Sequence, residues 1–321
     1  MAWLLVAMGW ANFAMGQSAP MRLVRTLPMP GVRGRIDHLS VDVRNERLFV
    51  SALASDALEI FDLKNGKLIR TLHGLSEPQG NLYMPASNRL FVANGGNGDV
   101  RIFDGTTFRL LRTLHFPSDA DDLRRGASAG TLFLAYGEGA IAELDSSTGK
   151  ILGEVRVDGH PEAFAFDAGT IFVNVPAANE IEVLDWAGKR VAARWKLGAN
   201  RWNFPMAIDR ADHRLFVVCR RPEELLVLDT SSGKIVTHLS AVGDPDDVYF
   251  DHARKRLYIS GGAGDITVIQ QLSPDRYRLI ANLPTAPGAR TSLFVPALGR
   301  FYLAVPRRGS APAEIRVYQV E

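Results

Sequence analysis

A sevenfold repeat constrains this chain more than any other feature of its sequence. A short apolar segment, usually an aromatic residue between two aliphatic ones, recurs at residues 48–50, 90–92, 132–134, 171–173, 215–217, 257–259 and 301–303. Successive copies are separated by 42, 42, 39, 44, 42 and 44 residues. A strand-forming repeat with a period in the low forties is typical of β-propeller blades. The sequence therefore predicts an all-β fold, a seven-bladed β-propeller.

Other parts of the repeat predict four antiparallel strands per blade. A second apolar strand follows each core and ends in an acid in five repeats, at Asp62, Asp104, Asp145, Asp185 and Asp229. A turn containing glycine, such as Asn65-Gly66-Lys67, commonly comes next, because glycine tolerates the positive φ angle of a tight hairpin. A further strand lies upstream of each core and alternates apolar residues, as at Met206 and Ile208.

The two ends of the chain predict how the ring closes. Residues 23–27, Leu-Val-Arg-Thr-Leu, nearly copy the outermost strands at residues 68–72 and 110–114, whereas the seventh repeat stops after its third strand at Glu321. We therefore expect residues 22–27 to complete the last blade beside residues 314–319. Such pairing removes a free sheet edge.

The N-terminal residues predict export. Residues 1–16 carry no charged side chain, residues 2–14 are mostly apolar, and the small residues Ala14 and Gly16 suit a signal-peptidase site. This indicates a signal peptide over residues 1–16, lacking the usual basic n-region, and one propeller domain over residues 17–321. A start further upstream or a membrane anchor stays open. The remaining sequence contains no run long enough to span a membrane, so we expect a monomer in the periplasm or outside a bacterial cell.

The repeat resembles that of the YncE-like, YVTN-repeat propellers along essentially the whole mature chain. Phe91-Val92-Ala93-Asn94 stands where that family's name motif stands, and Arg35-Ile36-Asp37-His38 opens the first blade. The resemblance implies export and a propeller fold. The wider group includes lactonase-like enzymes and binding proteins, so the resemblance leaves the chemistry open.

The repeat register selects candidate site residues. Propeller ligands usually bind over the central channel, where the loops leading into the innermost strands meet. Five residues before the end of each innermost strand stand Asp37, Gln79, Asp121, Glu162, Phe204, Asp246 and Arg290. Neighbouring polar residues complete the predicted ligand-binding set, which is Arg35, Asp37, Gln79, Asp121, Asp122, His160, Asn203, Arg220, Arg221, Asp246, Asp247, Arg290 and Arg307.

Two chemical interpretations of these residues stand beside a structural one. Crowded carboxylates require a cation, an arginine or raised pKa values, so a divalent metal is a candidate cofactor, with Asp37, His38, His160 and Glu162 as candidate ligands. His38 and Glu162 are also candidate catalytic groups that would polarise or deprotonate a substrate. The structural interpretation is that the acids accept hydrogen bonds from the N–H groups of neighbouring loops.

Two functional hypotheses follow, and composition does not decide whether the protein is an enzyme. In the first, the propeller binds a polar, anionic small molecule or a peptide through the arginines around the channel. In the second, it is a metal-assisted, lactonase-like hydrolase or lyase that uses the same site. A third hypothesis is that the protein is a purely structural scaffold. A formal net charge of +2 argues against a nucleic-acid partner.

Overall fold

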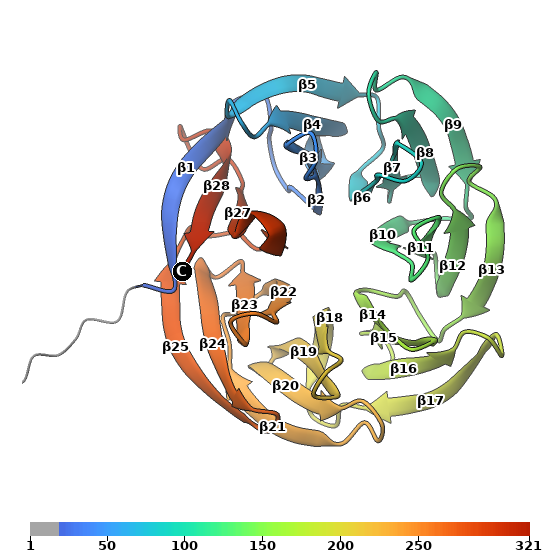
Figure 1. Cartoon of the computed structure of the whole chain (residues 1–321), viewed down its shortest axis with the longest axis vertical. Coiled ribbons are helices and arrows are strands. Elements are labelled where there is room, and N and C mark those ends of the chain that lie inside the picture. The colour runs from blue at the N-terminus through green and yellow to red at the C-terminus, as the bar shows by residue number, and fades with distance from the viewer. Residues whose placement is uncertain (1–18) are drawn as a thin grey trace, which may run out of the picture.

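The structure is a ring of seven blades, each a four-stranded antiparallel sheet (Figure 1). It is a computed structural model and describes residues 19–321. The predicted fold class and blade number are confirmed, and each repeated apolar core forms the second strand of its blade. The predicted signal peptide lies outside the described residues.

The strands follow the chain order from the axis outward in six of the blades. Blades one to three contain β2 (Leu39–Asp42), β3 (Arg47–Ala52), β4 (Ala57–Asp62), β5 (Lys67–His73); β6 (Pro78–Met84), β7 (Arg89–Asn94), β8 (Asp99–Asp104), β9 (Leu110–His115); β10 (Ala120–Arg125), β11 (Thr131–Tyr136), β12 (Ala140–Asp145) and β13 (Ile151–Arg156). Blades four to six contain β14 (Phe164–Asp167), β15 (Thr170–Val175), β16 (Glu180–Asp185), β17 (Arg190–Lys196); β18 (Arg201–Asp209), β19 (Arg214–Arg221), β20 (Glu223–Asp229), β21 (Ile235–Ser240); β22 (Pro245–Asp251), β23 (Arg256–Gly261), β24 (Asp265–Ser273) and β25 (Arg276–Pro284). Blade seven contains β26 (Ser292–Val295), β27 (Arg300–Val305), β28 (Ala313–Val320) and β1 (Met21–Met29), and two short 3₁₀ turns span Leu53–Ser55 and Pro296–Leu298.

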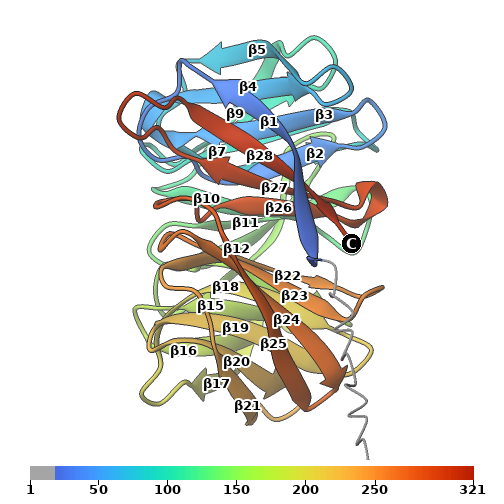
Figure 2. The ribbon, with the colours of Figure 1, turned by 90° about the vertical axis from the view of Figure 1, so that its left-hand side faces the viewer.

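The N-terminal strand closes the ring as predicted. β1 pairs antiparallel with β28, and its register places Arg22 opposite Gln319 and Leu27 opposite Ile315. Figures 1 and 2 show β1 running along the outer side of β28, so that segments from the two ends of the chain share one blade. Leu27 is fully buried. The closure therefore combines a hydrogen-bonded ladder with apolar packing.

Every outermost strand carries a register shift at the same point. In β1 the shift lies between Leu23 and Arg25, and the corresponding shifts occur where β5, β9, β13, β17, β21 and β25 pair with their inner neighbours. A bulge interrupts pairing and twists an edge strand away from partners. Because β1 shares the irregularity, it has the geometry of an outer strand as well as the sequence of one.

Seven apolar clusters fill the spaces between the blades. The aromatic residue of the repeat core lies in these clusters, with Phe49, Phe91 and Phe216 fully buried. Twisted sheets that pack face to face in this way direct their innermost strands toward the ring axis. None of the helical segments in the described part of the chain is long or apolar enough to cross a membrane.

Candidate functional site

The innermost strands enclose a cavity of about 840 Å³ along the ring axis. We call the face that carries Asp37 the upper face and the face that carries the hairpins after the innermost strands the lower face. All seven residues selected by the repeat register line the cavity, namely Asp37, Gln79, Asp121, Glu162, Phe204, Asp246 and Arg290. Arg35, His38, Asp122, His160, Arg220 and Asp247 also line it. One register thus brings residues from seven blades to one mouth.

Three sequence-predicted ligand residues do not line the cavity. Asn203 is buried between blades four and five, where its amide donates to the Asn174 side chain (2.9 Å) and to the Glu180 carbonyl (3.0 Å). The Arg221 guanidinium lies over the ring of Trp202, 4.5 Å from its centroid. Arg307 donates to the Pro30 carbonyl at 2.8 Å.

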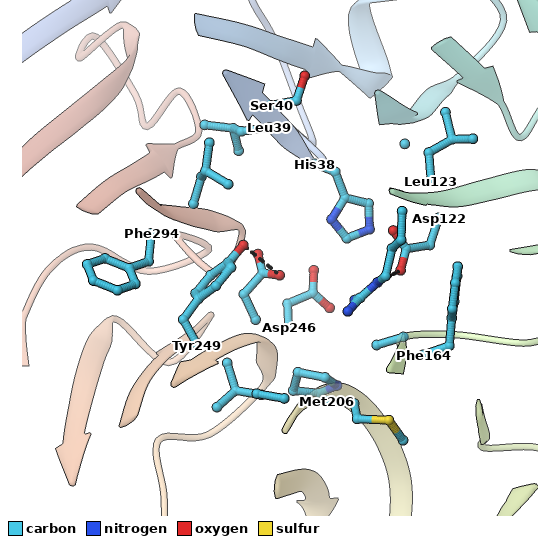
Figure 3. A pocket seen from close by; sticks show the side chains of 18 of the residues that line it. His38, Leu39, Ser40, Asp122, Leu123, Phe164, Met206, Asp246, Tyr249 and Phe294 are labelled. Carbon is cyan, nitrogen blue, oxygen red and sulfur yellow. Dashed lines mark hydrogen bonds and ion pairs between the residues drawn. The ribbon is translucent and has the colours of Figure 1, made fainter. Parts of the chain in front are cut away.

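His38 occupies a negatively charged position in the cavity. Figure 3 shows its ring pointing inward, with Asp122 on one side and Tyr249 on the other. Its Nε2 lies 3.7 Å from an oxygen of Asp37. Burial lowers the pKa of His38, but the charges of Asp37, Asp122 and Asp247 outweigh burial and raise that pKa to about 10. His38 is therefore protonated at neutral pH, the state in which it would polarise a substrate rather than accept a proton from it.

The arginines of the mouth already have carboxylate partners. Arg35 pairs with Asp37 at 2.8 Å, and Arg124 pairs with Asp122 at 2.6 Å. Arg220 and Arg290 both bind the two carboxylates of Asp244 and Asp246, at 2.6 to 3.3 Å. The paired carboxylates offset the charge of these guanidinium groups and so weaken their attraction for a further anion. The anionic ligand clamped by arginines, expected from the sequence, therefore loses its main support.

In a second part of the mouth, Asp121 and Glu162 form no salt bridge with any arginine of residues 19–321, and Asp121 pairs with His160 instead. Asp121, His160 and Glu162 each offer one ligand atom, and these three atoms lie within 4.8 Å of one another. Bonds of about 2.1 Å to a tetrahedral ion would place such atoms about 3.4 Å apart. The three side chains would therefore need to close by no more than about 1.4 Å, which rotamer adjustment can provide. Of the metal ligands predicted from the sequence, His160 and Glu162 belong to this cluster, whereas Asp37 and His38 do not.

The hydrogen bonds of His160 orient one ring nitrogen toward that cluster. Its Nδ1 lies 2.7 Å from the Gly137 carbonyl oxygen, which can only accept, so Nδ1 carries a proton. Its Nε2 faces an oxygen of Asp121 at 3.2 Å. In the neutral imidazole this nitrogen would present a lone pair to a carboxylate, which requires a proton or a cation between them. A backbone carbonyl that holds the opposite N–H is the usual support of a metal-binding histidine.

The same cluster has perturbed pKa values. Burial opposes protonation of His160, but its hydrogen bond to Asp121 and the charge of that residue raise its pKa to about 9. Burial, together with the charge of Asp121, raises the pKa of Glu162 to about 8. Burial also raises the pKa of Asp121. Without a cation, His160 and Glu162 are therefore mostly protonated at neutral pH, which offsets the negative charge of the cluster. A protonated Glu162 carboxyl does not act as a general base.

Sequence reasoning missed three polar residues of the mouth. Asp119 accepts from the Gln79 amide at 2.6 Å, Arg124 neutralises Asp122, and the Tyr249 hydroxyl donates to the Ser292 carbonyl at 2.8 Å. Strand alternation could have found two of them, because Arg124 and Tyr249 stand two residues after Asp122 and Asp247 and share their side of the strand. Asp119 lies outside β10 with φ of 36°, a loop position that periodicity does not report.

Comparison with known proteins supports the fold and a distant sequence relationship. No protein-family model matches the chain. The chain is 27% identical over 143 residues to the uncharacterized protein YncE of Salmonella typhimurium, a match that covers 43% of this chain and only 39% of the relative, and YncE of Salmonella typhi matches to the same extent. The chain is consistent with a YncE-like propeller family.

Solved structures agree on the architecture. A chain of the mitotic checkpoint complex superposes with a TM-score of 0.79 at 14% identity, covering 100% of this chain and 98% of the other. The WD40 repeats of RRP9 superpose with a TM-score of 0.77 at 10% identity, covering 95% and 98%. At such identities the likeness to WD40 proteins concerns the fold alone. The repeat thus builds a seven-bladed propeller, and the function of the chain depends on its own site residues.

Proposed function

We propose that this protein is an exported propeller that binds a small polar molecule at the upper mouth of its axial cavity, through a divalent metal ion held by Asp121, His160 and Glu162. The main support for this proposal is that these three ligand atoms lie within 4.8 Å of one another beside the cavity. One imidazole and two carboxylates suit Zn²⁺ or Mn²⁺. Export rests on the apolar residues 2–14.

The metal explains how an anionic group could bind in a mouth whose arginines are occupied. A divalent ion with three protein ligands keeps coordination positions for water or for an oxygen of the bound molecule. His38, cationic at neutral pH, lines the same cavity and would attract the same negative charge. The ligand class expected from the sequence is thus retained, but with a different anchoring group.

Calorimetric titration of metal-stripped protein with Zn²⁺ and Mn²⁺ tests the metal site. We expect one ion per chain and a loss of about 10-fold or more in affinity for Asp121→Asn and Glu162→Gln. Binding should release protons, because the ion replaces those on the cluster. Asp158→Asn is the matched control, since Asp158 belongs to a different acidic group with Glu180 and Glu182, where Arg194 and Lys196 already pair with the acids. Loss of binding in Asp158→Asn alone, or unchanged binding in both cluster variants, would contradict the proposal.

The ligand is tested separately by thermal denaturation with sugar acids, lactones and phosphates, each with and without the metal. A ligand of the native state raises Tm, and we expect the increase to require the metal. An increase that persists in metal-stripped protein and in Glu162→Gln would show that the ligand binds without the metal.

A metal-assisted hydrolase is the second candidate function. This function is favoured because the candidate site has three protein ligands beside the cavity. Three ligands would leave a coordination position open for a water molecule that the metal ion could activate. Hydrolysis of lactones or esters by the metal-loaded protein, lost in Glu162→Gln, would support it. Binding of a lactone without turnover would leave the binding function alone.

A further inference from the structure

A second cavity of about 510 Å³ lies on the lower face, between blades three and four. Its wall contains residues of two hairpins, namely Gly126, Ala127, Ser128, Thr131, Ala168, Gly169 and Thr170. Arg125, Phe166 and Arg210 line both this cavity and the axial one, so the two adjoin at the lower end of the axis. The metal cluster lies at the opposite end of the innermost strands, and this lower cavity plays no part in the function proposed above.

Two arginines of the lower cavity lack the carboxylate partners that the upper arginines have. Arg125 donates to the Tyr83 carbonyl at 2.9 Å and Arg210 donates to the Phe166 carbonyl at 2.6 Å. Within residues 19–321, neither guanidinium forms a salt bridge. Burial also lowers the pKa of Arg125, as is usual for a cation without a counter-charge. Each guanidinium retains several N–H donors.

Three aromatic side chains and the carboxylate of Glu143 also line the lower cavity. The ring of Phe133 lies 4.8 Å from that of Phe166 and 4.9 Å from that of Trp186, measured between centroids. All three residues line the cavity, and Phe166 and Trp186 are only half-buried. The Trp186 indole donates to Glu143 at 2.9 Å, so this N–H already has its acceptor. The aromatic wall therefore offers ring faces and edges rather than hydrogen-bond donors.

We propose that the lower cavity binds a small aromatic carboxylate, with the carboxylate between Arg125 and Arg210 and the ring against Phe133, Phe166 and Trp186. Guanidinium groups bind carboxylates through paired N–H donors, and aromatic pairs favour the tilted contacts that this wall can make. A carboxylate without a ring would leave the aromatic wall uncovered. A neutral aromatic compound would leave both arginines without a counter-charge.

Calorimetric titration with benzoate, benzyl alcohol and acetate tests this site. We expect benzoate to bind more tightly than either comparison compound. Arg125→Gln and Arg210→Gln should each weaken benzoate binding by about 10- to 100-fold, which is the usual loss for a truncated charge-assisted hydrogen bond. Arg276→Gln is the matched control, because Arg276 is also exposed and lies on β25, in blade six. Asp121→Asn should leave benzoate binding unchanged, which separates this site from the metal cluster.

Absence of benzoate binding to the wild-type protein would overturn the proposal. Equal benzoate affinity in the wild type and both arginine variants would also overturn it. Loss of binding in Asp121→Asn with retention in Arg210→Gln would place the benzoate at the upper mouth instead. Circular dichroism of each variant shows whether the fold is intact, and Trp186→Leu provides a second variant that weakens benzoate binding without removing an arginine.

Discussion

Gly80 provides a test of how the blades position the metal cluster. Gly80 lies in β6, and a Cβ atom added there would stand 2.1 Å from the Asp121 carbonyl oxygen and 3.1 Å from the Leu123 backbone nitrogen, both in the adjacent strand β10. Cβ atoms essentially never approach other atoms within 3.0 Å. Gly80→Ala must therefore displace the two strands by at least 0.9 Å, directly at Asp121.

We expect two effects of Gly80→Ala. Overpacking should lower the free energy of unfolding by about 1–3 kcal/mol. At about 2.1 cal/mol/K per residue for the entropy of unfolding, this corresponds to a fall in Tm of roughly 1.6 °C per kcal/mol for a domain of about 300 residues. Displacement of a ligand should weaken Zn²⁺ binding by about 10-fold or more, comparable to the loss of an outer-shell support. The two effects have one cause, the contact with the Asp121 backbone.

Gly31→Ala is the control, because Gly31 has no atom within 4 Å of the added Cβ and its φ is not in the left-handed region. Urea denaturation of metal-stripped protein and calorimetric Zn²⁺ titration measure the two quantities. If Gly80→Ala matched Gly31→Ala in both unfolding free energy and Zn²⁺ affinity, the close approach of β6 and β10 would not control the cluster. A loss of stability with unchanged Zn²⁺ affinity would refute the coupling between them.

Three further predictions concern the ring, the mouth and the core. Leu27→Ala in the closing strand should lower the unfolding free energy by about 2–5 kcal/mol in urea denaturation, whereas Leu23→Ala on the same strand, at a side chain that is 48% exposed, should change it by less than about 0.5 kcal/mol. Burial, together with the charge of Asp246, raises the pKa of Asp247 to about 7, so the native state keeps a proton that the unfolded chain loses above about pH 4. Stability should therefore fall as pH rises from about 4 to about 7, with a slope of up to about 1.4 kcal/mol per pH unit. Asp247→Asn should flatten this slope, and an unchanged slope would exclude Asp247 as its source. Burial of Cys219 raises the pKa of its thiol to about 12, so iodoacetamide should label it only after denaturation, and rapid labelling of the native protein would contradict its buried position.

The candidate site could be predicted from the sequence where the repeat register applies. The register found the seven mouth positions because equivalent residues of equivalent strands reach equivalent places around an axis. Asn203 was predicted only as the neighbour of Phe204, a register position that does line the cavity. The Asn203 side chain is instead buried between blades, where it donates to Asn174, and the repeat does not report this contact.

Contacts between blades could not be predicted in the same way. The sequence places Arg220 near the mouth, but its pairing with Asp244 and Asp246 depends on how blade five lies against blade six. The anionic ligand expected from the sequence assumed arginines without partners. Side-chain reach and rotamer choice decided otherwise, and neither has a periodic signal.

The sequence by itself determined the number of blades and the order of their strands, because these follow from the apolar periodicity. It also determined the closure by residues 22–27, because a segment with the sequence of an outermost strand stands at the N-terminus, whereas the last repeat lacks that strand. The tertiary structure alone decided the charge state of the mouth, since the pKa values of His38 and Glu162 depend on burial and on carboxylates from other blades. It also brought Asp121 of blade three next to His160, which lies 39 residues later in the sequence and leads into the neighbouring blade four. Electrostatic energies depend on distance and solvent exposure, and these become defined only when the ring has closed.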